Sequence, residues 1–210
     1  MKKAICTALS VVFLVLMIGI APTQSVHAAT TWTVTNTADT STAVPGNCPH
    51  ATNCRLRDAV AAASAGDTIL FDASLSGQTI ELVSTVTLSK DVTIDGSALD
   101  SPITISGVTT NDGSGNSRVF IIDSSIKANL QSLTITKSNI TGYPYSGGID
   151  VYNDAVLTIT DCTISNNTGY ANGGGILNWW GTVLITNSTV SNNTAISGAG
   201  IYSQGGTMTC

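Results

Sequence analysis

The sequence predicts an all-β fold: a right-handed parallel β-helix, or solenoid, with a short N-terminal capping helix and an incomplete C-terminal end. Short Thr- and Ile-rich strands recur about every 25 residues, the signature of stacked repeats. Glycine-rich turns that end in isoleucine recur with a similar spacing. Charged residues make up only 10% of the chain, so few residues favour surface helices and many favour strands.

Residues 1–28 are predicted to form a signal peptide. Lys2 and Lys3 precede an apolar run over residues 4–20, and Val26-His27-Ala28 places small residues at the −3 and −1 positions of a cleavage site. The alternative is an uncleaved membrane anchor, but the run is short for a span of about 20 residues. We therefore expect an exported protein, extracellular or on the bacterial cell surface, with no membrane span in the mature chain.

Residues 29–66 are predicted to form an N-terminal strand, a loop and the capping helix. The helix is expected over residues 55–63, because Leu56, Val60 and Ala63 share one face and Gly66 ends it. It lies directly before the first solenoid strand, where an open end needs cover.

The cysteines divide into two groups. Cys48 and Cys54 enclose a short turn-rich loop and are predicted to form a disulfide in an exported chain, the alternative being two free thiols. Cys162 has the strand parity of an interior residue and is expected to be buried.

Residues 67–210 are predicted to form about six coils. Leu133-Thr134-Ile135-Thr136 is expected to recur as Leu157-Thr158-Ile159-Thr160 and as Val183-Leu184-Ile185-Thr186, with the next copy opening at Met208. Alternating side chains would line the interior with Leu and Ile and the exterior with Thr. Either Asn166 is expected to stack near Asn192 or Asn167 near Asn193, and glycines are expected to allow positive φ at the corners.

Upstream, five more strands are expected with looser spacing. They are residues 68–72, 79–83, 92–95, 103–106 and 119–122.

Other repetitive β folds fit less well. A left-handed β-helix needs a six-residue repeat, and a leucine-rich repeat needs helical segments and its own Leu and Asn pattern. A β-sandwich shows turns but no repeat of this length.

The segment Cys54-Arg55-Leu56-Arg57-Asp58-Ala59 resembles the Cys-Ser-Leu-Arg-Glu-Ala signature of the CSLREA domain. Residues 33–39, 66–71 and 90–96 are similar to other parts of that family's pattern, so the resemblance covers roughly residues 31–96. Arg55 and Asp58 depart from the signature, and both are expected on the helix surface. The later Gly-Gly-Ile and Ser-Asn-Asn motifs resemble repeats of polymorphic outer membrane proteins and β-helix adhesins. The resemblance implies a large exported surface protein and carries over no catalytic residue.

Composition argues against several functions. The net charge is −5, so no basic patch is expected for nucleic acid. No histidine cluster or Cys-x-x-Cys pair is present, so we expect no metal site and no cofactor. Asp150, Asp154 and Asp161 do not recur in a column, and few basic residues lie near them. We therefore expect no catalytic residue here, although polysaccharide lyases and glycoside hydrolases also use this fold.

Aromatic residues give the one candidate binding site. Tyr152 is expected to lie over Trp179, Trp180 follows, and Tyr202 is expected to flank the same face one position earlier in the register. Such a row forms either a platform for sugar rings or an aromatic ladder that stabilises neighbouring coils. The expected partner is a polysaccharide or cell-surface glycan.

Together these features predict an exported β-helix protein with a structural, adhesive or glycan-binding role. The alternative is a polysaccharide lyase or glycoside hydrolase whose catalytic coils lie beyond residue 210.

Overall fold

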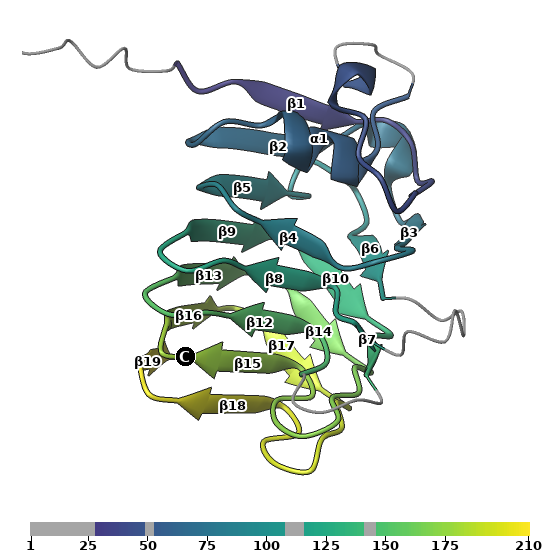
Figure 1. Ribbon diagram of the computed structural model, residues 1–210. Helices are drawn as coiled ribbons and strands as arrows, with labels where there is room; N and C mark the ends of the chain where they lie inside the picture. Colours follow the sequence, from purple (N-terminus) through teal and green to yellow (C-terminus); the bar gives the residue numbers. More distant parts are fainter. Residues whose placement is uncertain (1–27, 49–52, 108–115, 141–145) are drawn as a thin grey trace, which may run out of the picture.

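The chain winds as a parallel β-solenoid whose coils stack along one axis (Figure 1). The computed structural model describes residues 28–48, 53–107, 116–140 and 146–210. Five successive segments each supply one strand to each of three sheets, and the first sheet has one more strand before these segments and one after them. Within the described residues, no helix is both long enough and apolar enough to cross a membrane. The predicted signal peptide, apart from Ala28, lies outside these residues.

Sheet 1 is the longest of the three and starts at the N-terminal end of the solenoid. In spatial order its strands are β1 (Thr31–Val34), β2 (Asp67–Phe71), β5 (Val92–Asp95), β9 (Lys127–Gln131), β13 (Val156–Thr160), β16 (Thr182–Thr186) and β19 (Thr207–Thr209).

Sheets 2 and 3 contain five strands each, and neighbouring strands in all three sheets are parallel. Sheet 2 consists of β3 (Thr79–Glu81), β6 (Ile103–Ser106), β10 (Leu133–Thr136), β14 (Thr163–Ser165) and β17 (Thr189–Ser191). Sheet 3 consists of β4 (Val86–Leu88), β8 (Phe120–Ile122), β12 (Ile149–Val151), β15 (Ile176–Trp179) and β18 (Ile201–Gln204).

The connections from sheet 2 to sheet 3 vary in length from coil to coil, while the strands on either side keep their pairing. Two of them carry a short antiparallel pair, β7 (Asn116–Ser117) with β11 (Asn139–Ile140). Elsewhere the chain forms two 3₁₀ turns, η1 (Pro45–Asn47) and η2 (Ala73–Leu75).

The predicted stacking of residues one coil apart is confirmed. Leu157 pairs with Val183, and Val183 pairs with Met208. Ile149, Ile176 and Ile201 also lie in one column, which aligns the glycine-rich turns as expected.

The register predicted for residues 133–136 is wrong. β10 lies in sheet 2, where Thr134 pairs with Thr163, and the strand beside β13 is β9, with Ala128 next to Leu157. Consecutive strands of one coil share the same apolar and Thr alternation, so β10 resembles β13 although the two lie in different sheets. β9 was not predicted, because the sequence Lys-Ala-Asn-Leu-Gln lacks β-branched residues.

The interior is an apolar column that runs the length of the solenoid. Alternate residues of each strand point inward, as Leu157 and Ile159 do. Cys162 is buried among them as expected. Burial raises the pKa of its thiol to about 11, which keeps the group protonated.

One polar column also runs through the interior. Asn167 is fully buried and stacks on Asn193, as one of the two expected pairs. Its Nδ2 donates to Asn193 Oδ1 at 3.1 Å and to the Ile135 carbonyl at 3.1 Å, and its Oδ1 accepts from the Ser138 backbone N–H. Asn193 Nδ2 in turn donates to the Ile164 carbonyl at 2.9 Å. The side-chain amides therefore add hydrogen bonds between successive coils, next to the backbone hydrogen bond from the Thr194 N–H to the Asn167 carbonyl.

Glycine supplies left-handed backbone at some corners, as expected, for example at Gly173, Gly198 and Gly205, but other residue types supply it more often. Among the residues that the structure describes, nine non-glycine residues have positive φ, and they recur in three columns, one at each corner. Asn, Asp and Ser predominate because they tolerate this region better than other side chains. The columns are Ser132, Asp161 and Asn187; Lys137, Asn166 and Asn192; and Ser125, Asp154 and Trp180.

Several turn glycines serve close packing between coils. A Cβ on Gly148 would lie 2.5 Å from the Gly175 carbonyl oxygen, and a Cβ on Gly174 would clash with the Ala199 carbonyl oxygen and lie 2.5 Å from that of Thr194. Neither has the positive φ expected of it. The glycine-rich turns thus allow the backbones of successive coils to approach.

The N-terminal end is closed by β1 and by α1 (Leu56–Ala62), which confirms the predicted helix. Leu56 and Ala59 are buried against the first coil. A disulfide joins Cys48 to Cys54 in the preceding loop. Lys90 Nζ donates to the carbonyls of Ala61 and Ala63 at the C-terminal end of the helix, where a cation is favourable.

Arg55 and Asp58 do not lie on the helix surface, which corrects that expectation. Both are buried, and Arg55 Nε and Nη2 donate to the two Asp58 oxygens at 2.6 and 2.9 Å. Asp58 also accepts from the Val44 backbone N–H and from Asn47 Nδ2. Burial by itself would raise the pKa of Asp58, but these hydrogen bonds outweigh it and lower the pKa. The two departures from the signature are thus paired with each other.

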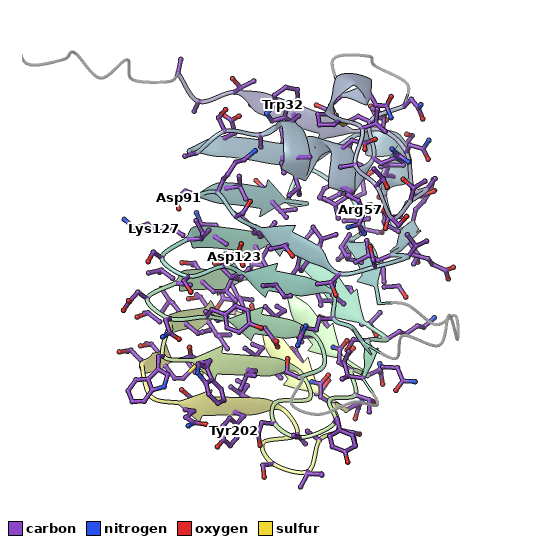
Figure 2. All side chains as sticks on the ribbon, in the orientation of Figure 1. Trp32, Arg57, Asp91, Asp123, Lys127 and Tyr202 are labelled. Carbon is purple, nitrogen blue, oxygen red and sulfur yellow. A yellow bond between two sulfur atoms is a disulfide. The ribbon has the colours of Figure 1, made fainter. Side chains whose placement is uncertain are left out.

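A second arginine of the helix ties the N-terminal loop to the solenoid. Arg57 donates to both oxygens of Asp39 and to the carbonyls of Ser84 and Thr85 (Figure 2). The capping segment is therefore held by buried charge as well as by apolar packing.

Candidate aromatic binding surface

The four aromatic residues predicted to form a site all lie on or beside the outer face of sheet 3. Val151 pairs with Asn178, so the next residues, Tyr152 and Trp179, are neighbours one coil apart, as expected. Neighbouring parallel strands lie about 4.8 Å apart. The two side chains point outward, because Val151 and Asn178 point into the interior.

Trp180 is the most exposed of the four, with 55% of its surface accessible. It occupies the corner after β15 with φ 64°, a conformation that is unusual for a bulky side chain. Equivalent corner positions hold Ser125, Asp154 and Gly205. A Cβ on Gly205 would lie 2.5 and 2.6 Å from atoms of the indole ring, so the ring packs against the backbone of Gly205. The backbone of the next coil therefore supports the exposed indole.

Tyr202 lies on the same face but not where it was expected. It pairs with Leu177, whereas Gln204 pairs with Trp179. Tyr202 thus lies two positions before Gln204, the residue opposite Trp179. Because strand side chains alternate, this even offset places Tyr202 and Trp179 on the same face. Figure 2 shows it on β18 at the lower end of sheet 3.

The aromatic surface, defined here as Tyr152, Trp179, Trp180 and Tyr202, is thus contributed by three successive coils. Trp179 and Trp180 are both exposed, and the two tyrosines are half-buried. An array of exposed rings on a rigid sheet presents flat apolar surface and polar ring edges together.

A buried ion pair lies on the same sheet. Asp150 follows the alternation of outward residues and pairs with Ile121 and Leu177, yet it is almost fully buried. Its Oδ2 lies 2.5 Å from Nε of Arg118, which is also buried. The sequence alone did not indicate this pair, because 32 positions separate the two residues. A lone acid between two buried β-branched residues was the available signal, since such a group needs a partner.

Burial raises the pKa of Asp150 to about 7, against an ordinary value of 3.8. The nearby Arg118 lowers the pKa, but the loss of hydration outweighs that attraction. Asp150 is therefore removed from contact with a dissolved substrate, although its titration falls in the neutral range.

The other acids considered from the sequence lie apart from it. Asp154 and Asp161 occupy two different corners and are exposed. The parts of the chain that the structure describes contain no group of three His, Cys, Asp or Glu side chains placed to hold a metal ion.

A shallow apolar groove lies elsewhere, along the connections from sheet 2 to sheet 3. Ile140, Tyr170 and Ile196 line it together with Thr168 and Thr194. Tyr170 is exposed there and is separate from the aromatic surface.

Comparisons with protein-family models, with curated proteins and with solved structures give no match.

Proposed function

We propose that this is an exported, CSLREA-like β-solenoid protein that binds polysaccharide or cell-surface glycan through the aromatic surface of sheet 3. The observation that carries the proposal is the pair Trp179 and Trp180. These two adjacent indoles are both exposed, and Trp180 adopts a costly left-handed backbone conformation while its ring packs on Gly205. Stability alone does not readily explain this arrangement.

Export is supported by two independent features. Residues 1–28 have the basic, apolar and small-residue order of a signal peptide. The Cys48–Cys54 disulfide suits an oxidising compartment outside the cytoplasm. A surface or extracellular location gives glycan polymers access to the solenoid wall.

The polysaccharide-cleaving alternative receives less support from the site. Asp150, which lies on the same sheet as the aromatic residues, is buried against Arg118. A general acid in carbohydrate cleavage needs both a raised pKa and access to the substrate, and Asp150 has the first but not the second. We therefore propose binding rather than catalysis for this surface.

The test measures retention of the exported chain on insoluble cellulose, chitin and peptidoglycan. The double variant Trp179→Ala/Trp180→Ala is expected to lose at least about tenfold in affinity for the retained polymer, since each ring contact contributes about 0.5–1.5 kcal/mol. Tyr170→Ala is the matched control, because it removes an exposed aromatic residue outside the surface. It should bind as the wild type does.

The competing explanation is an aromatic ladder that only stabilises neighbouring coils. In that case the double variant would unfold at a lower temperature and retain its affinity. No retention of the wild-type chain on any of the polymers would also refute the proposal.

A further inference from the structure

The corner beside the aromatic surface carries two carboxylates in register with its rings. Ile122 pairs with Val151, so Asp123 precedes Tyr152 in the same column. Asp154 precedes Trp180 in the corner column, and its backbone N–H donates to the Trp180 carbonyl at 3.2 Å. Each acid is therefore one coil, about 4.8 Å, from an aromatic residue.

Both carboxylates are available to a ligand. Asp154 is exposed and Asp123 is half-buried where β8 ends (Figure 2). Within the described residues, neither side chain has an ion pair or an accepted hydrogen bond, unlike Asp39 and Asp58 in the capping segment and Asp67 in β2. Lys127 is the basic residue nearest along the chain. It begins β9 on the adjacent sheet, where its backbone N–H donates to Asp91.

We propose that the aromatic surface selects glycans that carry free amino groups, such as polymers of de-N-acetylated amino sugars. This inference depends on the proposed function, since it specifies the ligand class of the same surface. An ammonium group is attracted to the face of an indole and to a nearby carboxylate. Trp180 with Asp154, and Tyr152 with Asp123, offer that combination twice on neighbouring coils.

The repetition of the pair favours a polymer over a single sugar. Two aromatic and acidic positions on one rigid wall can engage two amino groups of one chain, which raises affinity by effective concentration. A neutral or N-acetylated polymer would keep the ring contacts and lose the charge attraction. An acidic polymer would be repelled.

The experiment compares retention of the full exported chain on polyglucosamine immobilised on beads and on its immobilised N-acetylated form, at a pH at which the amines are protonated. We expect about tenfold tighter binding to polyglucosamine, because its amino groups add attractive contacts with two exposed carboxylates. Added salt should reduce this preference, because exposed charges are screened.

The variant Asp123→Asn/Asp154→Asn removes both charges, and asparagine tolerates the left-handed backbone at position 154. It should bind both polymers equally. Asp161→Asn is the matched control, since it neutralises an exposed left-handed aspartate at a different corner. This control should keep the preference, and equal unfolding temperatures would show that all three chains are folded.

Two results overturn the inference in different ways. Equal binding of both polymers by the wild type, or an unchanged preference in the double Asn variant, contradicts charge selection but leaves glycan binding intact. Absence of binding to either polymer or to the neutral glycans contradicts both the inference and the proposed function.

Discussion

Asn167 Nδ2 lies 3.1 Å from Oδ1 of Asn193 on the next coil, inside the solenoid. The same amide satisfies the Ile135 carbonyl and the Ser138 backbone N–H. One side chain thus connects three coils at a corner, beside backbone hydrogen bonds between the same coils.

Replacing Asn167 with Ala should therefore lower the free energy of unfolding by about 2–4 kcal/mol, because buried backbone groups lose their partners. Asn153→Ala is the control, since Asn153 is exposed on the same solenoid. It should change stability by less than about 0.5 kcal/mol. Chemical denaturation measures both values. Equal effects would mean that the ladder does not stabilise the coils.

The buried pair of the capping helix gives a second prediction. Asp58→Ala leaves Arg55 buried without its carboxylate and should cost about 3–5 kcal/mol. Asp72→Ala removes an exposed aspartate whose side chain accepts from the Ser74 N–H, and should cost much less. Denaturant midpoints and proteolysis of residues 28–66 check the comparison. Similar losses in the two variants would contradict a special role for burial.

Asp150 should make stability depend on pH. Its pKa is about 7 in the folded chain and near 3.8 when unfolded, so the folded state holds the proton more tightly. The stabilising contribution is complete below about pH 3.8 and is lost as the pH rises through about 7. The unfolding temperature should therefore fall between pH 5 and pH 8.

Asp150→Asn should flatten this dependence, since the amide does not ionise, and Asp161→Asn should leave it unchanged. Asp58 does not interfere in this range. Its pKa is lowered, so its contribution is lost only in more acidic solution. A wild-type slope in the Asp150→Asn variant would assign the dependence to another group.

The glycine-rich turns predict a cost for a single added methyl group. Gly174→Ala places a Cβ against the carbonyl oxygens of Ala199 and Thr194, which are backbone atoms with little room to move. We expect a loss of about 1–3 kcal/mol in thermal or chemical unfolding. Gly46→Ala is the control, because nothing lies within 4 Å of its Cβ position. A stable Gly174→Ala variant would show that successive coils can separate.

The architecture could be predicted from the sequence because stacking repeats its signal once per coil. Ile149, Ile176 and Ile201 reveal the spacing, and the apolar alternation reveals which side is interior. Residues 133–136 were placed in the wrong sheet for the same reason, since every strand of a coil carries that alternation. Recognising Lys127–Gln131 as the strand beside β13 would have given the correct register, but this segment has a weaker strand pattern.

The candidate site was predictable in part. Column positions follow from the register, which brought Tyr152 and Trp179 together. The packing of Trp180 on Gly205 and the pairing of Arg118 with Asp150 depend on side-chain direction and on which coil supplies a partner. Neither has a local sequence pattern. Arg55 and Asp58 were three residues apart on a helix and still required the surrounding loop to show that they are buried.

The variable connections between sheets 2 and 3 have a practical consequence. Coils of different length share one strand register, so the added length is absorbed on a single side of the wall. Such positions tolerate insertions at small thermodynamic cost. Foreign peptides grafted into this side would be displayed in a row, with one coil between neighbouring peptides, while the other sides of the solenoid stay unaltered.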